Sequence, residues 1–206
     1  EDVCHTANCG RAHFSSRLAV IASTLPDAAD HLAAYAAGDD PRCLFASEVE
    51  ENEPTEVVFM FGGQTPPLGA AGRELYASQP AFREAIDRCA GILDDHQRAR
   101  LQALFARGRP GHAERDALTD PGLFALEYAR AELWRSWGVE PSAMIGHSIG
   151  EFTAAVLSGV LELHDALRLV ASRGRLMGQM PRGVMLAVPL AEADLQEHLA
   201  GQKGLW

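Results

Sequence analysis

The fold is decided by the stretch Met144-Ile145-Gly146-His147-Ser148-Ile149-Gly150, in which a short apolar run passes into Gly-x-Ser-x-Gly. Residues 151–157 follow directly as an apolar helical segment. Gly-x-Ser-x-Gly between a strand and a helix is typical of a nucleophile elbow, a strained turn that projects the serine hydroxyl above the edge of a sheet. The motif predicts that Ser148 is a nucleophile. It also predicts that the backbone N–H of Ile149 points at the oxyanion that develops during the reaction. On its own it leaves open a tight turn in which Ser148 only caps the helix.

The elements around this stretch alternate between short apolar runs and longer helical segments. Residues 57–61 are apolar without alternation, which predicts a strand covered on both faces of a parallel sheet. Helices are expected at residues 79–95, 97–107, 121–137, 149–158 and 163–177. This order predicts an α/β fold, with helices on both sides of a parallel sheet.

Three regions differ in character along the chain. Residues 1–54 predict a small α/β unit with a strand at 18–22, a helix at 27–37 and a second apolar run at 43–46. The unit ends in an acidic stretch closed by a proline, which is typical of a linker. Residues 55–182 form the predicted core. Residues 183–206 predict the start of a small inserted α/β unit, with a strand at 184–188, a helix at 191–200 and a further strand beginning at 205.

Composition excludes several classes of function. The net charge of −10 argues against nucleic-acid binding, which calls for clustered positive charge. No apolar run approaches the roughly 20 residues that cross a bilayer, and the chain begins without a secretory signal. The four cysteines therefore indicate reduced thiols in a cytoplasmic protein. The spacing of Cys4, His5 and Cys9 is similar to that of one ligand pair of a zinc site. No second ligand pair follows at the usual spacing, so no metal is expected.

Several segments carry a family resemblance. Residues 146–151 read Gly-His-Ser-Ile-Gly-Glu, residues 61–64 read Phe-Gly-Gly-Gln, and Arg173 lies twenty-five residues after Ser148. Together they resemble the malonyl-CoA:acyl-carrier-protein transacylase family, in particular the acyltransferase domains of type I modular polyketide synthases. Residues 8–22 resemble the linker between a ketosynthase and its acyltransferase, and residues 135–141 resemble the approach to the elbow.

The resemblance implies a fold. The core, residues 55–182, would be a hydrolase-like parallel sheet. Residues 1–54 would be the ketosynthase–acyltransferase linker unit, and residues 183–206 the start of a ferredoxin-like inserted subdomain.

It also implies a mechanism. Ser148 would attack the thioester of malonyl-CoA, hold the acyl group as an ester, and pass it to the phosphopantetheine thiol of an acyl carrier protein. The backbone N–H groups of Gln64 and Ile149 would hold the oxyanion, and Arg173 would pair with the free malonyl carboxylate. His147 would help to shape the pocket without acting as the base. No permanently bound cofactor is implied.

Two features depart from the family pattern. Residues 63–67 read Gly-Gln-Thr-Pro-Pro, which is stiffer than the glycine-rich loop usual at this point. The family's catalytic histidine would fall beyond residue 206, so residues 1–206 alone are expected to be nearly inert, because an unassisted serine is a weak nucleophile.

The expected partners are an acyl carrier protein, an adjacent ketosynthase domain and malonyl-CoA. Self-association through exposed apolar surface is also expected. An aliphatic residue after the nucleophile, here Ile149, is similar to malonyl-selective members of the family and favours malonyl over methylmalonyl.

Three alternatives stay open at this point. The chain could be a serine hydrolase that shares the elbow, or a non-catalytic remnant that serves as a scaffold or docking element. Arg173 could be a solvated helix charge beside Arg168 and Arg175.

Overall fold

The computed structural model describes residues 2–49, 56–63, 69–105, 120–180 and 186–200. The chain divides into two compact units, Glu1–Glu56 and Val57–Trp206. The expected linker boundary at residues 54–55 and the expected strand at 205 lie outside the described residues. In the described parts, no helix is long and apolar enough to cross a membrane.

The N-terminal unit combines a two-stranded sheet with helices. Its elements are α1 (Asp2–Cys9), β1 (Ser16–Val20), α2 (Leu25–Ala36) and β2 (Leu44–Glu48). The two strands pair antiparallel, with Val20 opposite Leu44. Thr24 caps α2 by accepting the N–H of Asp27 at 3.3 Å, which is the ordinary start of a helix after a threonine. Sequence reasoning found β1, α2 and β2 but missed α1.

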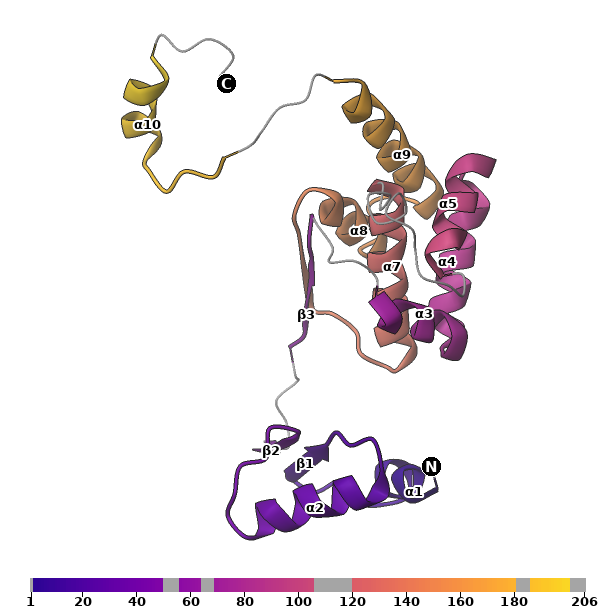
Figure 1. The fold of residues 1–206 in the computed structure, drawn as a ribbon, viewed down its shortest axis with the longest axis vertical. Helices are drawn as coiled ribbons and strands as arrows, with labels where there is room; N and C mark the ends of the chain where they lie inside the picture. The colour runs from indigo at the N-terminus through magenta and orange to yellow at the C-terminus, as the bar shows by residue number, and fades with distance from the viewer. Residues whose placement is uncertain (1, 50–55, 64–68, 106–119, 181–185, 201–206) are drawn as a thin grey trace. The chain divides into compact units, whose positions relative to one another are not determined.

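The C-terminal unit is a helical assembly with a short parallel sheet along one side (Figure 1). Strand β3 (Val58–Phe61) pairs in parallel with β4 (Ala143–Gly146), which places Phe61 opposite Gly146. The helices are α3 (Gly69–Ser78), α4 (Pro80–Ile92), α5 (Asp95–Phe105), α7 (Asp120–Ser136), α8 (Ile149–Leu157), α9 (Leu163–Gln179) and α10 (Glu192–Leu199). Sequence reasoning predicted all of these helices except α3.

Helix α7 is the centre of the core. It contacts α4, α8 and α9, and every residue from 121 to 129 is buried. A helix that is apolar on nearly all sides is stable only when other elements surround it. The largest fully buried side chains of α7 and of the helices packed on it include Phe82, Ile86, Phe124, Leu126, Leu167 and Val170.

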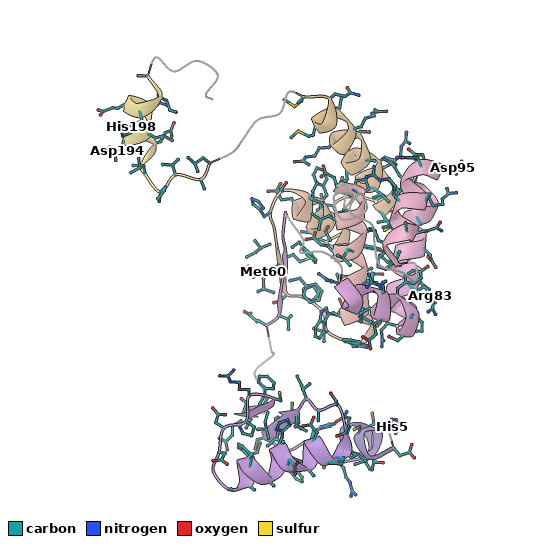
Figure 2. All side chains as sticks on the ribbon, in the orientation of Figure 1. His5, Met60, Arg83, Asp95, Asp194 and His198 are labelled. Atoms are coloured by element: carbon teal, nitrogen blue, oxygen red, sulfur yellow. The ribbon has the colours of Figure 1, made fainter. Side chains whose placement is uncertain are left out.

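The sheet is covered differently from the prediction. Phe61 is buried, whereas Val58 is 47% and Met60 is 77% exposed, and Met60 points away from the helices (Figure 2). Among the described residues, the helices therefore cover one face of β3 and not both. The apolar run contains no polar residue that would mark its outward face, so the pattern could not reveal this.

The strand expected at 184–188 is absent from residues 186–188, the part of it that the structure describes. Residues 186–188 are exposed and lie in no strand. No described strand lies beside them to supply backbone partners, and an isolated apolar run does not form a strand without one. The helix expected at 191–200 is present as α10.

The segment that leads from α7 into β4 is fixed by local hydrogen bonds. Gly138 adopts a φ of 82°, and its N–H donates to the carbonyl of Arg135 at 2.9 Å. The N–H of Val139 reaches back to the carbonyl of Trp134 at 3.1 Å. These two bonds form a Schellman motif, which needs a residue that tolerates a left-handed backbone.

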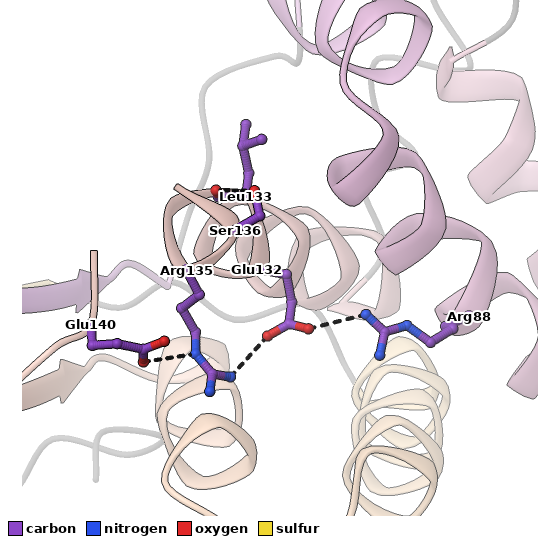
Figure 3. Close-up of polar contacts among 6 residues, drawn as sticks. All are labelled: Arg88, Glu132, Leu133, Arg135, Ser136 and Glu140. Atoms are coloured by element: carbon purple, nitrogen blue, oxygen red, sulfur yellow. Dashed lines mark hydrogen bonds and ion pairs between the residues drawn. The ribbon is translucent and has the colours of Figure 1, made fainter. Parts of the chain in front are cut away.

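A row of ion pairs runs along the same region (Figure 3). Glu132 on α7 accepts from Arg88 on α4 and from Arg135, each at 3.0 Å, and Arg135 also donates to Glu140 at 3.0 Å. Such partly exposed pairs contribute little individually, but the row ties α4, α7 and the approach to β4 together.

The core assignment predicts a sharp contrast along α9. Leu167 is fully buried, whereas Leu169 on the same helix is 52% exposed. Leu167→Ala is expected to lower the free energy of unfolding by about 2–5 kcal/mol, because it leaves a cavity. Leu169→Ala, the matched control, is expected to change it by less than about 0.5 kcal/mol. Denaturant titration of both variants measures the difference, and equal losses would contradict this description of the core.

Candidate active site

Ser148 stands at the junction of β4 and α8 in a strained backbone conformation. Its φ of 56° and ψ of −111° lie outside the regions that side chains favour. Of the residues that the structure describes, it alone has a positive φ without being glycine. Although it precedes α8, its hydroxyl makes no capping hydrogen bond, which argues against the helix-cap alternative. Strain of this kind costs about 1–3 kcal/mol and concentrates at functional sites.

The glycines of the motif are required by close backbone contact. A Cβ at Gly150 would lie 2.4 Å from the carbonyl oxygen of Phe61, and one at Gly146 would lie 2.4 Å from the backbone of Glu151. The N–H of His147 donates to the same Phe61 carbonyl at 2.9 Å. The end of β3 is therefore pressed directly against the elbow.

The start of the loop after β3 also lies on the elbow. A Cβ at Gly63 would be 2.6 Å from Nδ1 of His147 and 2.9 Å from Cβ of Ser148. Gln64, the expected second oxyanion donor, lies outside the described residues. Its neighbour Gly63 lies beside the nucleophile, and the role expected of Gln64 stays a prediction.

Ile149 is the first residue of α8 and is buried, at 1% exposure. The first N–H groups of a helix have no partner within the helix. Together with the partial positive charge of the helix N-terminus they favour an anion. The backbone of Ile149 thus has the chemistry expected of an oxyanion donor next to Ser148.

Arg173 on α9 reaches the nucleophile. Its Nη2 lies 3.4 Å from Oγ of Ser148, while its Nη1 donates to Oδ2 of Asp120 at 2.5 Å. The Arg173 side chain is 38% exposed and that of Asp120 is 28% exposed. Arg173 is therefore held in the site, which argues against a freely solvated charge, whereas Arg168 and Arg175 are exposed.

Asp120 was not singled out from the sequence. An acidic residue directly before a proline at the start of a helix is common for local reasons. Nothing in that pattern points to a partner 53 positions away. Only the packing of α9 against α7 brings the two side chains together.

The histidines that the structure describes do not reach the serine hydroxyl. Within the described ranges, the hydrogen bond from Arg173 is the one that reaches Oγ of Ser148. His147 is exposed, and its ring lies against Gly63. His164 is exposed and lies 3.2 Å from Asp165.

Metal-ligating residues do not gather in the described part of the chain. No group of three or more His, Cys, Asp or Glu side chains there could hold a metal ion. All four cysteines are free, and three of them, Cys4, Cys9 and Cys43, are exposed.

A buried carboxyl links α7 to the helix that follows the elbow. Glu127 on α7 is 7% exposed, and its Oε2 accepts from Oγ1 of Thr153 on α8 at 3.1 Å. Burial raises the pKa of Glu127 to about 7, although hydrogen bonds from Thr153 and the Gly62 backbone, and the charge of Arg130, act to lower that pKa. Sequence reasoning missed this residue, because one glutamate within an apolar helix carries no sign of its partners.

The close backbone contact predicts that the elbow tolerates no side chain at Gly150. Gly150→Ala is expected to lower the free energy of unfolding by at least about 2 kcal/mol, because the added methyl meets a backbone oxygen that cannot turn aside. Gly91→Ala on α4, where nothing lies within 4 Å of the new Cβ, is the control. It should leave stability unchanged or raise it by up to about 1 kcal/mol. Chemical denaturation of both variants checks this, and equal stabilities would refute the contact.

Glu127 predicts a pH-dependent stability. Its pKa is about 7 in the folded chain, above the ordinary value of 4.5, so the folded state binds the proton more tightly than the unfolded state. Its contribution to stability is therefore fully present below about pH 4.5 and is lost as the pH rises through about 7. Glu127→Gln should remove this loss. The variant is expected to gain stability relative to the wild type between pH 5 and pH 8, as measured by urea unfolding at each pH.

Glu84→Gln, at an exposed position on α4, is the control for this pH series. It should follow the wild type at every pH. A constant difference between Glu127→Gln and the wild type would mean that the carboxyl of Glu127 does not titrate in this range.

Comparison with known proteins adds family evidence to this geometry. The acyl transferase domain family matches residues 58–204, and the CurL-like PKS C-terminal family matches residues 1–32. Erythronolide synthase EryA2 of Saccharopolyspora erythraea is 40% identical over 192 residues, which cover 92% of this chain and 5% of that synthase. The chain thus spans a small fraction of the curated relative's length.

Solved structures resemble the chain as well. The acyltransferase domain of ZmaA superposes with a TM-score of 0.76 at 36% identity, covering 92% of this chain and 44% of that one. A malonyl-transacylase in complex with the type II PKS acyl-carrier protein, PlMCAT:AntF, gives 0.55 at 29% identity, covering 72% and 50%. Because the family match runs through most of the chain and a modular synthase is 40% identical to it, the chain belongs to the acyltransferase domains of type I modular polyketide synthases.

Proposed function

We propose that this chain carries the nucleophile part of an acyltransferase that loads a malonyl extender unit from CoA onto an acyl carrier protein. The observation that carries the proposal is the strained Ser148, whose hydroxyl makes no capping bond and lies 3.4 Å from the Arg173 guanidinium. The residues of a hydrolase-like core, 55–182, would build this site. Residues 1–54 would link it to a ketosynthase domain, and residues 183–206 would begin a ferredoxin-like subdomain.

The transfer has two steps. Oγ of Ser148 attacks the thioester carbonyl carbon, the C–S bond breaks, and CoA leaves as the thiol with the proton that the serine gives up. The phosphopantetheine thiol of the carrier protein then attacks the carbonyl carbon of the serine ester. The bond from that carbon to Oγ breaks as the new thioester forms, and the proton of the thiol returns to Oγ of Ser148. In both steps the backbone N–H groups of Ile149 and Gln64 would stabilise the oxyanion. A histidine outside residues 1–206 would act as the general base.

Arg173 would give the site its preference for malonyl. A guanidinium keeps its positive charge and can grip a carboxylate through paired hydrogen bonds. The acyl group on Ser148 would lie within reach of Arg173, so the free carboxylate of a malonyl group could meet it. His147 would help to shape the same pocket.

The partners follow from the relatives. The PlMCAT:AntF structure holds a malonyl-transacylase with an acyl-carrier protein, which supports a carrier protein as the acceptor here. The match of residues 1–32 to a PKS C-terminal family supports a place within a polyketide synthase, and the linker-like residues 8–22 lead us to propose a neighbouring ketosynthase. No tightly bound cofactor is proposed, because the phosphopantetheine arrives on the carrier protein.

The test of this proposal is radiolabelled malonyl-CoA offered to a version of the domain that includes the expected histidine. Label is expected on Ser148 and then on an added carrier protein, and Ser148→Ala should abolish both. Release of free malonate without carrier loading would instead indicate a hydrolase. A complete absence of label would indicate a non-catalytic scaffold. Residues 1–206 alone should stay essentially unlabelled.

Replacing Arg173 tests the carboxylate contact. Arg173→Ala is expected to reduce kcat/KM for malonyl-CoA by about 100-fold or more, typical of a lost charge-assisted contact, while acetyl-CoA is used as well as before or better. Arg175→Ala, at an exposed position on the same helix, should change neither rate. Equal losses for both thioesters would show that Arg173 only supports the fold.

Extender choice is a separate expectation. Because an aliphatic Ile149 follows the nucleophile, malonyl-CoA should be loaded in preference to methylmalonyl-CoA. Competition between the two esters, followed by mass spectrometry of the loaded carrier protein, measures the ratio. Predominant methylmalonyl loading would overturn this expectation.

A further inference from the structure

The guanidinium that the proposed function assigns to the substrate already has an anionic partner. Arg173 donates through Nη1 to Asp120 and through Nη2 to Ser148. A guanidinium has five N–H donors in a fixed plane, and these two contacts use two of them. The other N–H donors of Arg173 are therefore available to a ligand. The negative charge of Asp120, however, partly neutralises the positive charge that would attract a ligand carboxylate.

Asp120 is placed by the buried helix that it begins. It is the first residue of α7, whose next nine residues, 121–129, are all buried. On the other side, a Cβ at Gly174 would lie 3.5 Å from the Asp120 side chain. Residue 174 is therefore within ordinary van der Waals distance of Asp120, which places α9 beside the start of α7. The ion pair between Nη1 of Arg173 and Oδ2 of Asp120, at 2.5 Å, joins the two helices at this point.

Asp120 would repel a carboxylate that binds to Arg173. A carboxylate bound to the free donors of Arg173 would lie only a few ångströms from the carboxylate of Asp120. Both side chains of the pair are more than half buried, so solvent screens this repulsion only in part. An uncharged acyl group meets no such repulsion.

We propose that Asp120 is a specificity-determining residue that positions Arg173 beside Ser148 and, by offsetting its charge, lowers the site's preference for acyl groups with a free carboxylate. This inference rests on the proposed acyl transfer at Ser148. It adds that the preference is set by a pair of side chains, one on α9 and one on α7, and not by Arg173 alone.

The experiment separates charge from position. Asp120→Asn removes the charge but keeps an oxygen that can accept from Nη1. It is made in the version of the domain that includes the expected histidine, and kcat/KM is measured for malonyl-CoA and acetyl-CoA. The malonyl-to-acetyl ratio is expected to rise about tenfold or more, mainly through a lower KM for malonyl-CoA, because like-charge juxtaposition is strongly unfavourable.

Three further variants make the test specific. In an Arg173→Ala background, Asp120→Asn should raise the ratio less than it does in the wild type, because no guanidinium then holds the substrate carboxylate beside Asp120. Asp120→Glu, which keeps the charge, should retain the wild-type ratio. Asp165→Asn removes an equal charge from an exposed site on α9 and should also have no effect.

The outcomes are distinguishable. An unchanged or lower ratio in Asp120→Asn, with acylation intact, overturns this inference and leaves the proposed function standing. Wild-type domain that accepts neither thioester overturns the proposed function and this inference with it. Circular dichroism checks the folding of each variant. If Asp120→Asn fails to fold, Asp120→Ser removes the same charge, and the same rise in ratio is expected of it.

Discussion

Backbone packed against backbone at the Ser148 elbow is the constraint on which the rest of the structure depends. The Phe61 carbonyl accepts the N–H of His147 and leaves no space for a side chain at Gly150. Strand β3, strand β4 and helix α8 are thereby fixed relative to one another. The turn between them forces Ser148 into a conformation that few residues adopt. Once α8 is placed, it packs on α7 and α9, and α9 delivers Arg173.

Helix α7 carries three acidic side chains whose surroundings differ. Asp120, at its start, is paired with Arg173 beside the nucleophile. Glu127, in its buried middle, has a pKa raised to about 7 and is linked to α8 through Thr153. Glu132, nearer its end, joins Arg88 and Arg135 at the surface. Burial raises the pKa of Glu127, whereas Asp120 and Glu132 form ion pairs with arginines. The same helix therefore connects the site, the core and the surface.

The sequence revealed those parts of this arrangement that are local. The elbow was readable because glycine spacing, a strand and a helix occur within a few residues of Ser148. Arg173 was identified only through its family resemblance, since a lone arginine on a helix has no distinctive pattern. Asp120 and Glu127 were missed, because their partners lie 53 and 26 positions away. The open face of β3 was missed because both of its faces are apolar, and apolar alternation is what reveals a solvated side.

The conformation of Ser148 has a consequence for how this chain would respond to engineering for robustness. Glycine adopts a positive φ without the steric penalty that a side chain brings, so Ser148→Gly would relieve strain of about 1–3 kcal/mol. A selection that rewarded only thermal tolerance or yield would therefore favour glycine at the one position where the hydroxyl is indispensable to the proposed chemistry. Stability and activity are in direct opposition at this residue. A screen that measures only stability would not detect the loss of activity.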